Sequence, residues 1–210
     1  MSGTALSLGQ FAEFSAAVLK ALPRDMNPSD ALAWARNGEK LERVLQSALC
    51  PLATPVPATE PIVLSVDYSQ TLEQMIAAGH YDWKNDNITA KKFPVVGNGI
   101  VQFEAKVFHF DRDTSSQDNV DAIKAADPAN PWEPAKTEHL LAFGAKYPEE
   151  QRKYPIVALG SVAEVDGDRR VPYLYRFGAG RRLDLGWWGI GWGGFCRFLA
   201  VRKLSSAAVA

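Results

Sequence analysis

Apolar residues in the first fifty positions recur every three or four residues, which is the spacing of amphipathic helices. The apolar face of a first predicted helix consists of Phe11, Phe14, Val18 and Leu19. A second helix, which begins near Pro28, has its apolar face at Leu32, Trp34, Leu41, Val44 and Leu45. Four prolines follow within residues 50–61, a composition typical of a linker. We therefore predict a helical N-terminal arm over residues 1–50 and a Pro-rich linker over residues 51–60.

After the linker the apolar residues alternate with polar ones. A strand is predicted over residues 61–69, and a short helix over residues 71–79 with Thr71 and Gln74 as its capping box. The clearest strand follows the turn pair Asn98-Gly99. Its predicted inward side chains, which alternate with polar residues, are Val101, Phe103, Ala105 and Val107.

The second half of the chain predicts further helices and short strands. The helices are expected over residues 115–127, with Ser115 and Asp118 as a cap, and over residues 136–154. The strands are expected over residues 154–162, 170–177, 181–187 and 196–203. This order, without a βαβ run, indicates an α+β fold with short antiparallel strands late in the chain. The domain is predicted to span residues 61–203, followed by a disordered tail over residues 204–210.

The composition is that of an ordinary globular protein. Of the 210 residues 47% are hydrophobic and 22% are charged, and the net charge is -1. No stretch approaches the roughly 18 consecutive apolar residues of a membrane helix, so no membrane insertion is predicted. The N-terminus has no basic start and carries Glu13 within its apolar part, unlike a signal peptide. We expect the cytoplasm as the default location, with display on a cell surface or a virion as the alternative.

Positive charge gathers toward the C-terminus. Residues 144–203 hold eleven Lys and Arg against six Asp and Glu, whereas residues 1–143 hold twelve against eighteen. Such a cluster could favour an anionic partner. Arginines of this kind more often form a solvated face paired with nearby acids, and we favour that interpretation. Nucleic acid is therefore not expected as a partner.

The sequence contains none of the usual catalytic or metal-binding motifs. The histidines have no metal-ligand spacing with one another or with the cysteines. Residues 111–118 lack the glycine and the closing glutamate of a calcium loop. Cys196 lies beside Arg197, which could lower the pKa of its thiol, but no partner for a catalytic triad is identifiable. We predict no catalytic residue, no metal and no cofactor, and expect Cys196 to be a small buried thiol.

Residues 186–196 form an unusual segment that holds five glycines, three tryptophans and no charged residue. The glycines interrupt both the strand period and the helix period, which favours a looped surface over a packed layer. Aromatic side chains on such a loop give a large contact area at a low cost in conformational entropy. Trp187 is the predicted anchor of the loop in the core, because it continues the alternating run of Leu183 and Leu185.

Three segments resemble a known fold, namely residues 131–148, 154–177 and 191–203. Together they resemble the C-type lectin fold in its bacterial and phage form, which formylglycine-generating enzymes share. Within that group the chain is most similar to the variable proteins of diversity-generating retroelements. The resemblance covers about residues 60–203 and implies a helix before a short strand near Gly160-Ser161. It also implies a hairpin turn at Gly178-Ala179-Gly180 and a closing strand over Phe195 to Arg202.

In that family a reverse transcriptase copies a template repeat with errors at adenines and rewrites the 3′ end of the target gene. The resemblance therefore implies a variable, ligand-binding region at about residues 173–196. The residues that it places there are Tyr175, Arg176, Phe177, Gly178, Arg181, Gly186, Trp188, Gly189, Ile190, Trp192, Gly193, Gly194, Phe195 and Cys196. Most of these residue types can arise from an AAC-type codon with both adenines randomised. Trp188 and Trp192 cannot.

The sequence thus predicts a non-catalytic protein that binds an unknown protein or surface ligand. Its N-terminal helices are candidates for assembling an oligomer. Three alternatives stay open. The chain could be a structural or adhesion protein of fixed specificity, a thiol-dependent enzyme of the same fold that uses Cys196, or a nucleic-acid-binding protein that uses the arginine cluster. The resemblance does not extend to the sugar-binding calcium site of animal C-type lectins, nor to the paired cysteines of formylglycine-generating enzymes.

Overall fold

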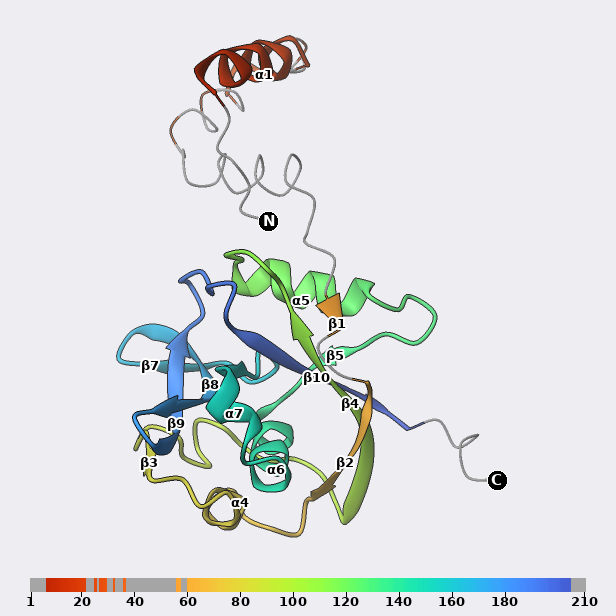
Figure 1. The fold of residues 1–210 in the computed structure, drawn as a ribbon, viewed down its shortest axis with the longest axis vertical. Coiled ribbons are helices and arrows are strands. Elements are labelled where there is room, and N and C mark those ends of the chain that lie inside the picture. Colours follow the sequence, from red (N-terminus) through yellow and green to blue (C-terminus); the bar gives the residue numbers. More distant parts are fainter. Residues whose placement is uncertain are drawn as a thin grey trace. The chain divides into compact units, whose positions relative to one another are not determined.

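The computed structural model describes residues 7–21, 25, 27–29, 32, 36, 56–57 and 60–204. The chain divides into two compact units, Met1–Pro51 and Leu52–Ala210, and Figure 1 shows the elements of each. In the first unit α1 spans Leu8–Ala21, as the helical spacing predicted. Most of the second predicted helix lies outside the described residues, and so do residues 205–210 of the predicted tail.

The second unit is built on a large open sheet with mixed strand directions. One of its ladders joins β2 (Ile62–Asp67), β4 (Ile100–His109) and β10 (Arg197–Lys203), with both neighbours antiparallel to β4. Two short strands pair at the sides of this ladder. The strand β1 (Val56–Pro57), which falls within the predicted linker, pairs with β4, and β5 (Glu133–Pro134) pairs with β10.

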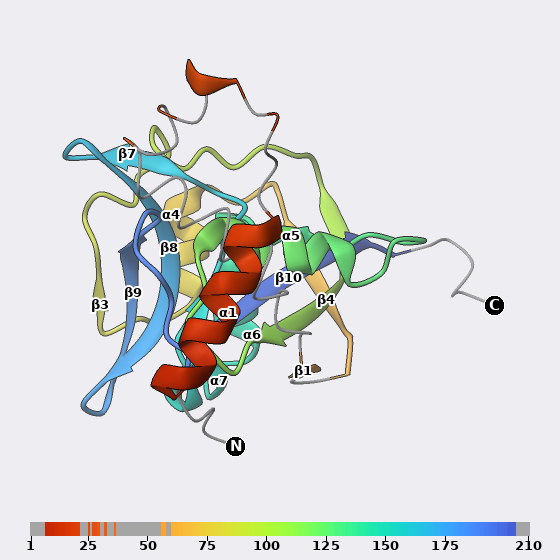
Figure 2. The same cartoon turned by 90° about the horizontal axis from the view of Figure 1, so that it is seen from above.

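From β10 the sheet continues through β6 (Ile156–Val157), β8 (Asp168–Phe177) and β9 (Gly180–Trp187) to β3 (Trp83–Lys84). The β6–β8 and β8–β9 pairs are antiparallel, whereas β10–β6 and β9–β3 are parallel. The short strand β7 (Ala163–Val165) pairs with β8. Figure 2 shows β8, β9 and β3 side by side at one edge of the unit. This mixed arrangement is the α+β class that the element order predicted.

The described helices of this unit are α4 (Leu72–Ala78), α5 (Ser116–Ala125), α6 (Thr137–Lys146) and α7 (Glu150–Lys153). The predicted N-caps are confirmed, since Thr71 and Ser115 each accept a backbone N–H bond at the start of α4 and α5. The single helix predicted over residues 136–154 is wrong, because the chain forms two helices there. Pro148 stands between them, and a proline disfavours helical backbone at the residue before it.

Two hydrophobic clusters lie on opposite faces of β4 and β10. On one face Phe103, Ala105 and Val107 pack with side chains of α4 and α6, as the alternation predicted. On the other face Phe108 and Phe198 pack with side chains of α5. Figure 1 shows α5 on one side of these strands and α4 and α6 on the other. The strand predicted as half-buried is therefore covered on both faces at its C-terminal end.

Candidate ligand-binding surface

The residues predicted to bind a ligand fall into two separate parts of the structure. Phe177 and Gly180 pair at the turn of the β8–β9 hairpin, whereas Arg170 and Trp187 pair at its other end. At about 3.3 Å per residue, these ends lie about 23 Å apart. The predicted residues near the turn are Tyr175, Arg176, Phe177 and Gly178. Most of the others lie in the loop 188–196, beyond the opposite end of β9.

The loop 188–196 is held through its main chain. Thr114 and Trp192 exchange two backbone hydrogen bonds, with N···O distances of 3.0 and 2.7 Å. Ser116 Oγ donates to the carbonyl oxygen of Trp188 at 2.7 Å and accepts from the indole Nε1 of Trp192 at 2.8 Å. The segment just before α5 and the first residue of α5 therefore set the path of the loop.

Three further side chains bind the end of the loop. His109 Nε2 lies 2.8 Å from the carbonyl oxygen of Gly194, and Asp113 Oδ1 accepts from the Gly194 N–H at 3.3 Å. Arg197 Nη1 donates to the carbonyl oxygens of residues 194–196 at 3.1 to 3.5 Å. These contacts bind backbone atoms of the loop, so the loop has a defined conformation despite its glycine-rich sequence.

Trp192 anchors the loop in the core. Its side chain is 8% exposed, and its ring packs edge-on against Phe198 and Tyr173, with centroids 6.1 and 6.3 Å apart. Gly186 is needed beneath the indole, because a Cβ at that position would lie 2.4 Å from Trp192 Cη2. The prediction that Trp192 and Gly186 lie on the ligand-binding surface is therefore wrong.

The prediction that Trp187 anchors the loop is also wrong, since 46% of this residue is exposed. Trp187 lies on the same face of β9 as Leu183 and Leu185, as the alternation predicted, but the core ends at Leu185. Beyond it, the Trp187 ring lies against the Arg170 guanidinium, whose Cζ is 3.8 Å from the ring centroid. Its indole Nε1 donates to Asp168 Oδ2 at 3.3 Å.

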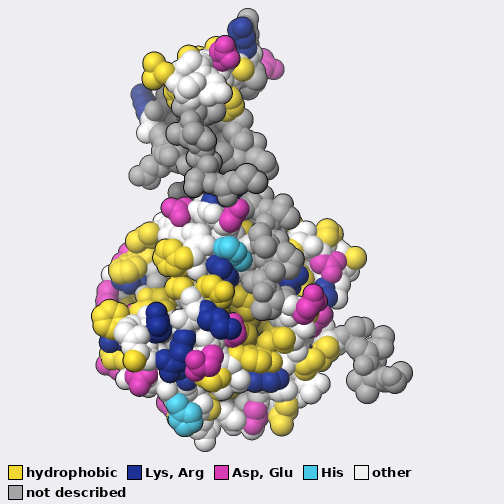
Figure 3. All heavy atoms as spheres, in the orientation of Figure 1, with side chains coloured by type: hydrophobic (Ala, Val, Ile, Leu, Met, Phe, Trp, Pro, Cys, Tyr) yellow, Lys and Arg dark blue, Asp and Glu magenta, His cyan; other side chains and the backbone are white. Residues whose placement is uncertain are grey.

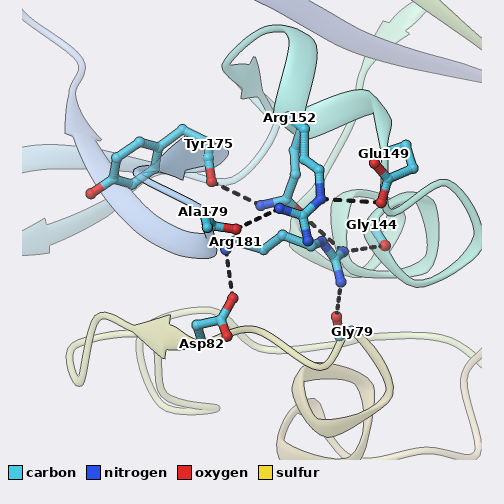
Figure 4. A network of polar contacts seen from close by, with 9 residues as sticks. Gly79, Asp82, Gly144, Glu149, Arg152, Tyr175, Ala179 and Arg181 are labelled. Carbon is cyan, nitrogen blue, oxygen red and sulfur yellow. Dashed lines mark hydrogen bonds and ion pairs between the residues drawn. The ribbon is translucent and has the colours of Figure 1, made fainter.

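Arg181 is buried, contrary to its predicted place on the surface. Its guanidinium donates to the carbonyl oxygens of Gly79 and Gly144, both at 2.6 Å, and to Gln151 Oε1 at 3.0 Å. Its backbone N–H donates to Asp82 Oδ2 at 2.6 Å. Figure 4 shows these contacts converging from separate elements on one side chain. Arg181 thus ties β9 to α6, to α7 and to the end of α4.

Cys196 is buried, as expected for a small structural thiol, and so does not lie on the ligand-binding surface. Burial raises the pKa of the thiol to about 11, although the neighbouring Arg197 acts in the opposite direction. Desolvation outweighs the charge of Arg197 because a thiolate loses its hydration inside the protein. The thiol is consequently protonated at neutral pH, and an unprotonated thiolate is the form that acts as a nucleophile.

The other predicted residues are exposed or half-buried. Phe177, Ile190 and Phe195 expose 63, 59 and 67% of their surface. Trp188 is half-buried, and the Arg169 guanidinium lies 4.7 Å from its ring centroid. The remaining members, of which the last three are half-buried, are Arg176, Gly178, Gly189, Tyr175, Gly193 and Gly194.

The sheet places Arg182, Trp83 and Tyr173, which are not among the predicted ligand-binding residues, beside Tyr175 and Phe177. Arg182 of β9 pairs with Tyr175 of β8 on one side and with Trp83 of β3 on the other, so the three side chains share one face. The Arg182 Cζ lies 4.4 Å from the ring centroid of Phe177. Tyr173 stacks on Tyr175, with centroids 5.0 Å apart and 22° between the rings. We call these five side chains the outer face of β8–β9–β3.

A cavity of about 400 Å³ lies between α7, β4 and β10, near the base of the loop. Its apolar wall includes Phe143. Of its polar groups, His109 and Arg197 already bind loop carbonyl oxygens, and Lys153 pairs with a glutamate of α7 at 2.7 Å. These polar groups of the cavity are therefore paired within the protein, and two of them support the loop.

His139 is buried at the start of α6. Its Nδ1 accepts from the Lys136 N–H at 3.0 Å, and burial lowers the pKa of the imidazole to about 4. Within the part of the chain that the structure describes, no group of three or more His, Cys, Asp and Glu side chains could hold a metal ion. None of the described helices is long and apolar enough to cross a membrane.

Comparisons of the chain with family models, with curated proteins and with solved structures found no match. The architecture is a large open sheet with a few helices, in the α+β class.

Proposed function

We propose that this chain is a non-catalytic ligand-binding protein of the C-type lectin type, whose C-terminal surface is diversified by a retroelement. The observation that carries the proposal is the way the loop 188–196 is held. Its shape depends on main-chain bonds to His109, Asp113, Thr114 and Arg197. Side chains of the loop that reach solvent can therefore change while the loop keeps its conformation.

The order of elements supports the lectin-type assignment. Helices α6 and α7 precede two short strands, β6 and β7, which lie on either side of Gly160-Ser161. The β8–β9 hairpin follows with its turn at residues 178–179, and β10 closes the domain against β4. This is the arrangement that the resemblance to bacterial and phage C-type lectin folds implies, and it brings a late hairpin and a loop to the surface.

Burial restricts which codons can vary without loss of the fold. Trp192 cannot arise from an AAC-type codon, and it lies in the core. Arg181 and Cys196 can arise from such a codon, yet both are buried and should stay constant. The positions at which we expect variation, because their side chains are exposed or their Cβ would be, are Arg176, Phe177, Gly189, Ile190 and Phe195. Gly178 is exposed too, but its φ of +60° disfavours other residues, so it should stay glycine.

Population sequencing of the 3′ end of the gene tests the proposal. We expect substitutions at the exposed positions, matched to adenines in a nearby template repeat, and constant codons for Arg181, Trp192 and Cys196. The buried codons are the internal control, because ordinary mutation and relaxed selection do not follow adenines. Uniform codons throughout residues 173–196 would contradict diversification and leave a binding surface of fixed specificity. Variation spread equally over buried and exposed codons would contradict the structural basis of the proposal.

We also propose that the first unit assembles oligomers. The exposed side chains of α1 include Leu8, Phe11 and Leu19, which are large and apolar. Such side chains are typical of an interface between helices. Light scattering of the full chain and of a chain without residues 1–50 tests this. We expect the full chain to be an oligomer and the chain without residues 1–50 to be a folded monomer. The same number of subunits in both would contradict the proposal.

A further inference from the structure

Arg182 is held between aromatic rings on the outer face of β8–β9–β3. Its Cζ lies 5.4 Å from the ring centroid of Trp83 and 4.4 Å from that of Phe177. Trp83 and Phe177 are 42 and 63% exposed, and Arg182 is half-buried between them. Tyr175, which pairs with Arg182 in the β8–β9 register, lies beside it. The guanidinium is thus positioned on a surface that is mostly aromatic.

Arg182 has no carboxylate partner, and its guanidinium donates no hydrogen bond, among the residues that the structure describes. Two other arginines of this region do have a carboxylate partner. Arg152 of α7 pairs with Glu149 at 3.1 Å, and Arg170 pairs with Asp168 at 3.4 Å. Figure 3 shows basic side chains, some beside acidic ones, set among hydrophobic side chains on the face of the molecule that carries α7. The charge of Arg182 is therefore available to a partner.

The surroundings of Arg182 suit a carboxylate. The rings lie near the guanidinium as cation–π partners, and its N–H donors, which form a planar fork, have no acceptor among the described residues. A carboxylate pairs with this fork through two parallel hydrogen bonds. The flanking rings of Trp83 and Phe177 shield the pair from part of the solvent, which strengthens the electrostatic attraction. The same rings offer apolar contact area to the groups next to the carboxylate.

Nearby acids do not satisfy Arg182. Asp184 lies on the same face, but its Oδ1 accepts from Asn85 Nδ2 and from the backbone N–H of Leu185, both at 2.8 Å. Trp83 also lines a cavity of about 480 Å³, whose lining includes Asp82, Asp86 and Lys84, and the two aspartates do not favour a carboxylate there. The edge of the guanidinium is consequently where an anionic group would bind.

We propose that the outer face of β8–β9–β3 binds an acidic segment of a partner protein. A side-chain carboxylate of that segment pairs with Arg182, and adjacent apolar side chains contact Trp83 and Phe177. Nucleic acid fits less well, because a phosphate backbone needs a track of cations, whereas this face has one arginine among its five side chains. The inference rests on the proposed ligand-binding function and adds the chemical class of the partner.

A selection from random peptides displayed on phage, with the immobilised full-length chain as bait, tests the inference. We expect the retained peptides to be rich in Asp and Glu next to apolar residues. Their Kd should be measured with the wild type, with Arg182→Gln and with Arg182→Lys. Arg169→Gln is the matched control, because the Arg169 guanidinium also lies near a tryptophan ring, although Arg169 is exposed and Arg182 is half-buried. Urea midpoints of all variants establish that each remains folded.

Loss of the charge in Arg182→Gln should weaken binding about tenfold or more, as expected for a charge-assisted pair. Arg182→Lys should weaken it less, since the charge remains but the planar fork is lost. If Arg182→Gln fails to fold, a Kd for Arg182→Lys equal to that of the wild type would overturn the inference. Retained peptides without acidic residues, no retained peptide, or a larger loss with Arg169→Gln would overturn it as well. Uniform codons in the population would contradict diversification but not the binding of an acidic segment. The failure of the proposed function and the failure of this inference are therefore distinguishable.

Discussion

Replacing Trp192 with alanine should remove most of the stability of the second unit. The side chain is 8% exposed, and replacing such an aromatic residue in a core costs about 3–5 kcal/mol. Loss of the indole hydrogen bond to Ser116 adds about 1 kcal/mol. Ser116 Oγ keeps its bond to the carbonyl of Trp188, so this hydroxyl is not left unpaired. A total of about 4–6 kcal/mol is comparable with the whole stability of a typical domain, which is about 5–15 kcal/mol.

Two other variants separate burial from residue type. Trp187→Ala removes the same side chain from a position where its contacts with Arg170 and Asp168 are at the surface. An exposed cation–π contact contributes about 0.5–1 kcal/mol, so the expected loss is about 1 kcal/mol. Trp192→Phe keeps an aromatic ring in the core but loses the N–H donor, and the expected loss is about 1–3 kcal/mol.

Urea denaturation followed by far-UV circular dichroism measures these losses without depending on tryptophan emission. The free energies of unfolding are compared at a common m value, which reports the surface exposed on unfolding. The expected order of destabilisation is Trp192→Ala, then Trp192→Phe, then Trp187→Ala. If Trp187→Ala destabilises the protein as much as Trp192→Ala does, the assignment of Trp192 as the anchor is refuted.

Three further predictions concern buried groups. Arg181→Lys keeps the charge, but one ammonium cannot replace the guanidinium at three separated acceptors. We expect it to cost about 2–4 kcal/mol in urea unfolding, and an equal loss for Arg182→Lys would contradict this. His139→Gln keeps an acceptor at the start of α6 without titrating. Because the folded-state pKa of about 4 lies below the ordinary 6.5, the wild type should lose up to about 3 kcal/mol of stability as the pH falls through this range. The variant should lose less stability than the wild type by that amount. The buried Glu138, whose pKa is raised, titrates in both proteins, so its effect cancels in the difference. Parallel curves of stability against pH for the two proteins would refute the prediction. Cys196, with its thiol pKa at about 11, should react with iodoacetamide at pH 8 far more slowly in the folded protein than in urea, as followed by mass spectrometry of its peptide.

Local signals predicted the elements whose determinants lie close together in the sequence. The capping residues Thr71 and Ser115 mark helix starts because each bonds to a backbone N–H three residues on. The alternation of Phe103, Ala105 and Val107 predicted which side chains of β4 point into the core, because this depends only on positions close together in the sequence. The helix break at Pro148 was missed, although the proline itself was a sufficient signal.

Features that depend on distant segments could not be predicted in this way. The alternation in β9 puts Arg181 on the inward face with Leu183, but a buried arginine is stable only if acceptors from elsewhere surround it. Those acceptors come from residues far away in the chain, so the sequence suggested a surface charge. The exchange of roles between Trp187 and Trp192 has a similar cause, because the segment 113–116, distant in the sequence, binds Trp192 and helps to determine which indole is covered.

The two exposed parts of the candidate surface should respond differently to substitution. In the loop 188–196 the conformation is set by main-chain bonds, so Ile190 and Phe195 should vary independently of each other in a population. On the outer face, Arg182 is held by the rings of Trp83 and Phe177, so a change at Phe177 alters the environment of Arg182 itself. Phe177 should therefore vary mainly among residues with large flat or apolar side chains. Counts of paired substitutions from the population sequencing measure this, and small or acidic residues at position 177 as often as at position 190 would contradict it.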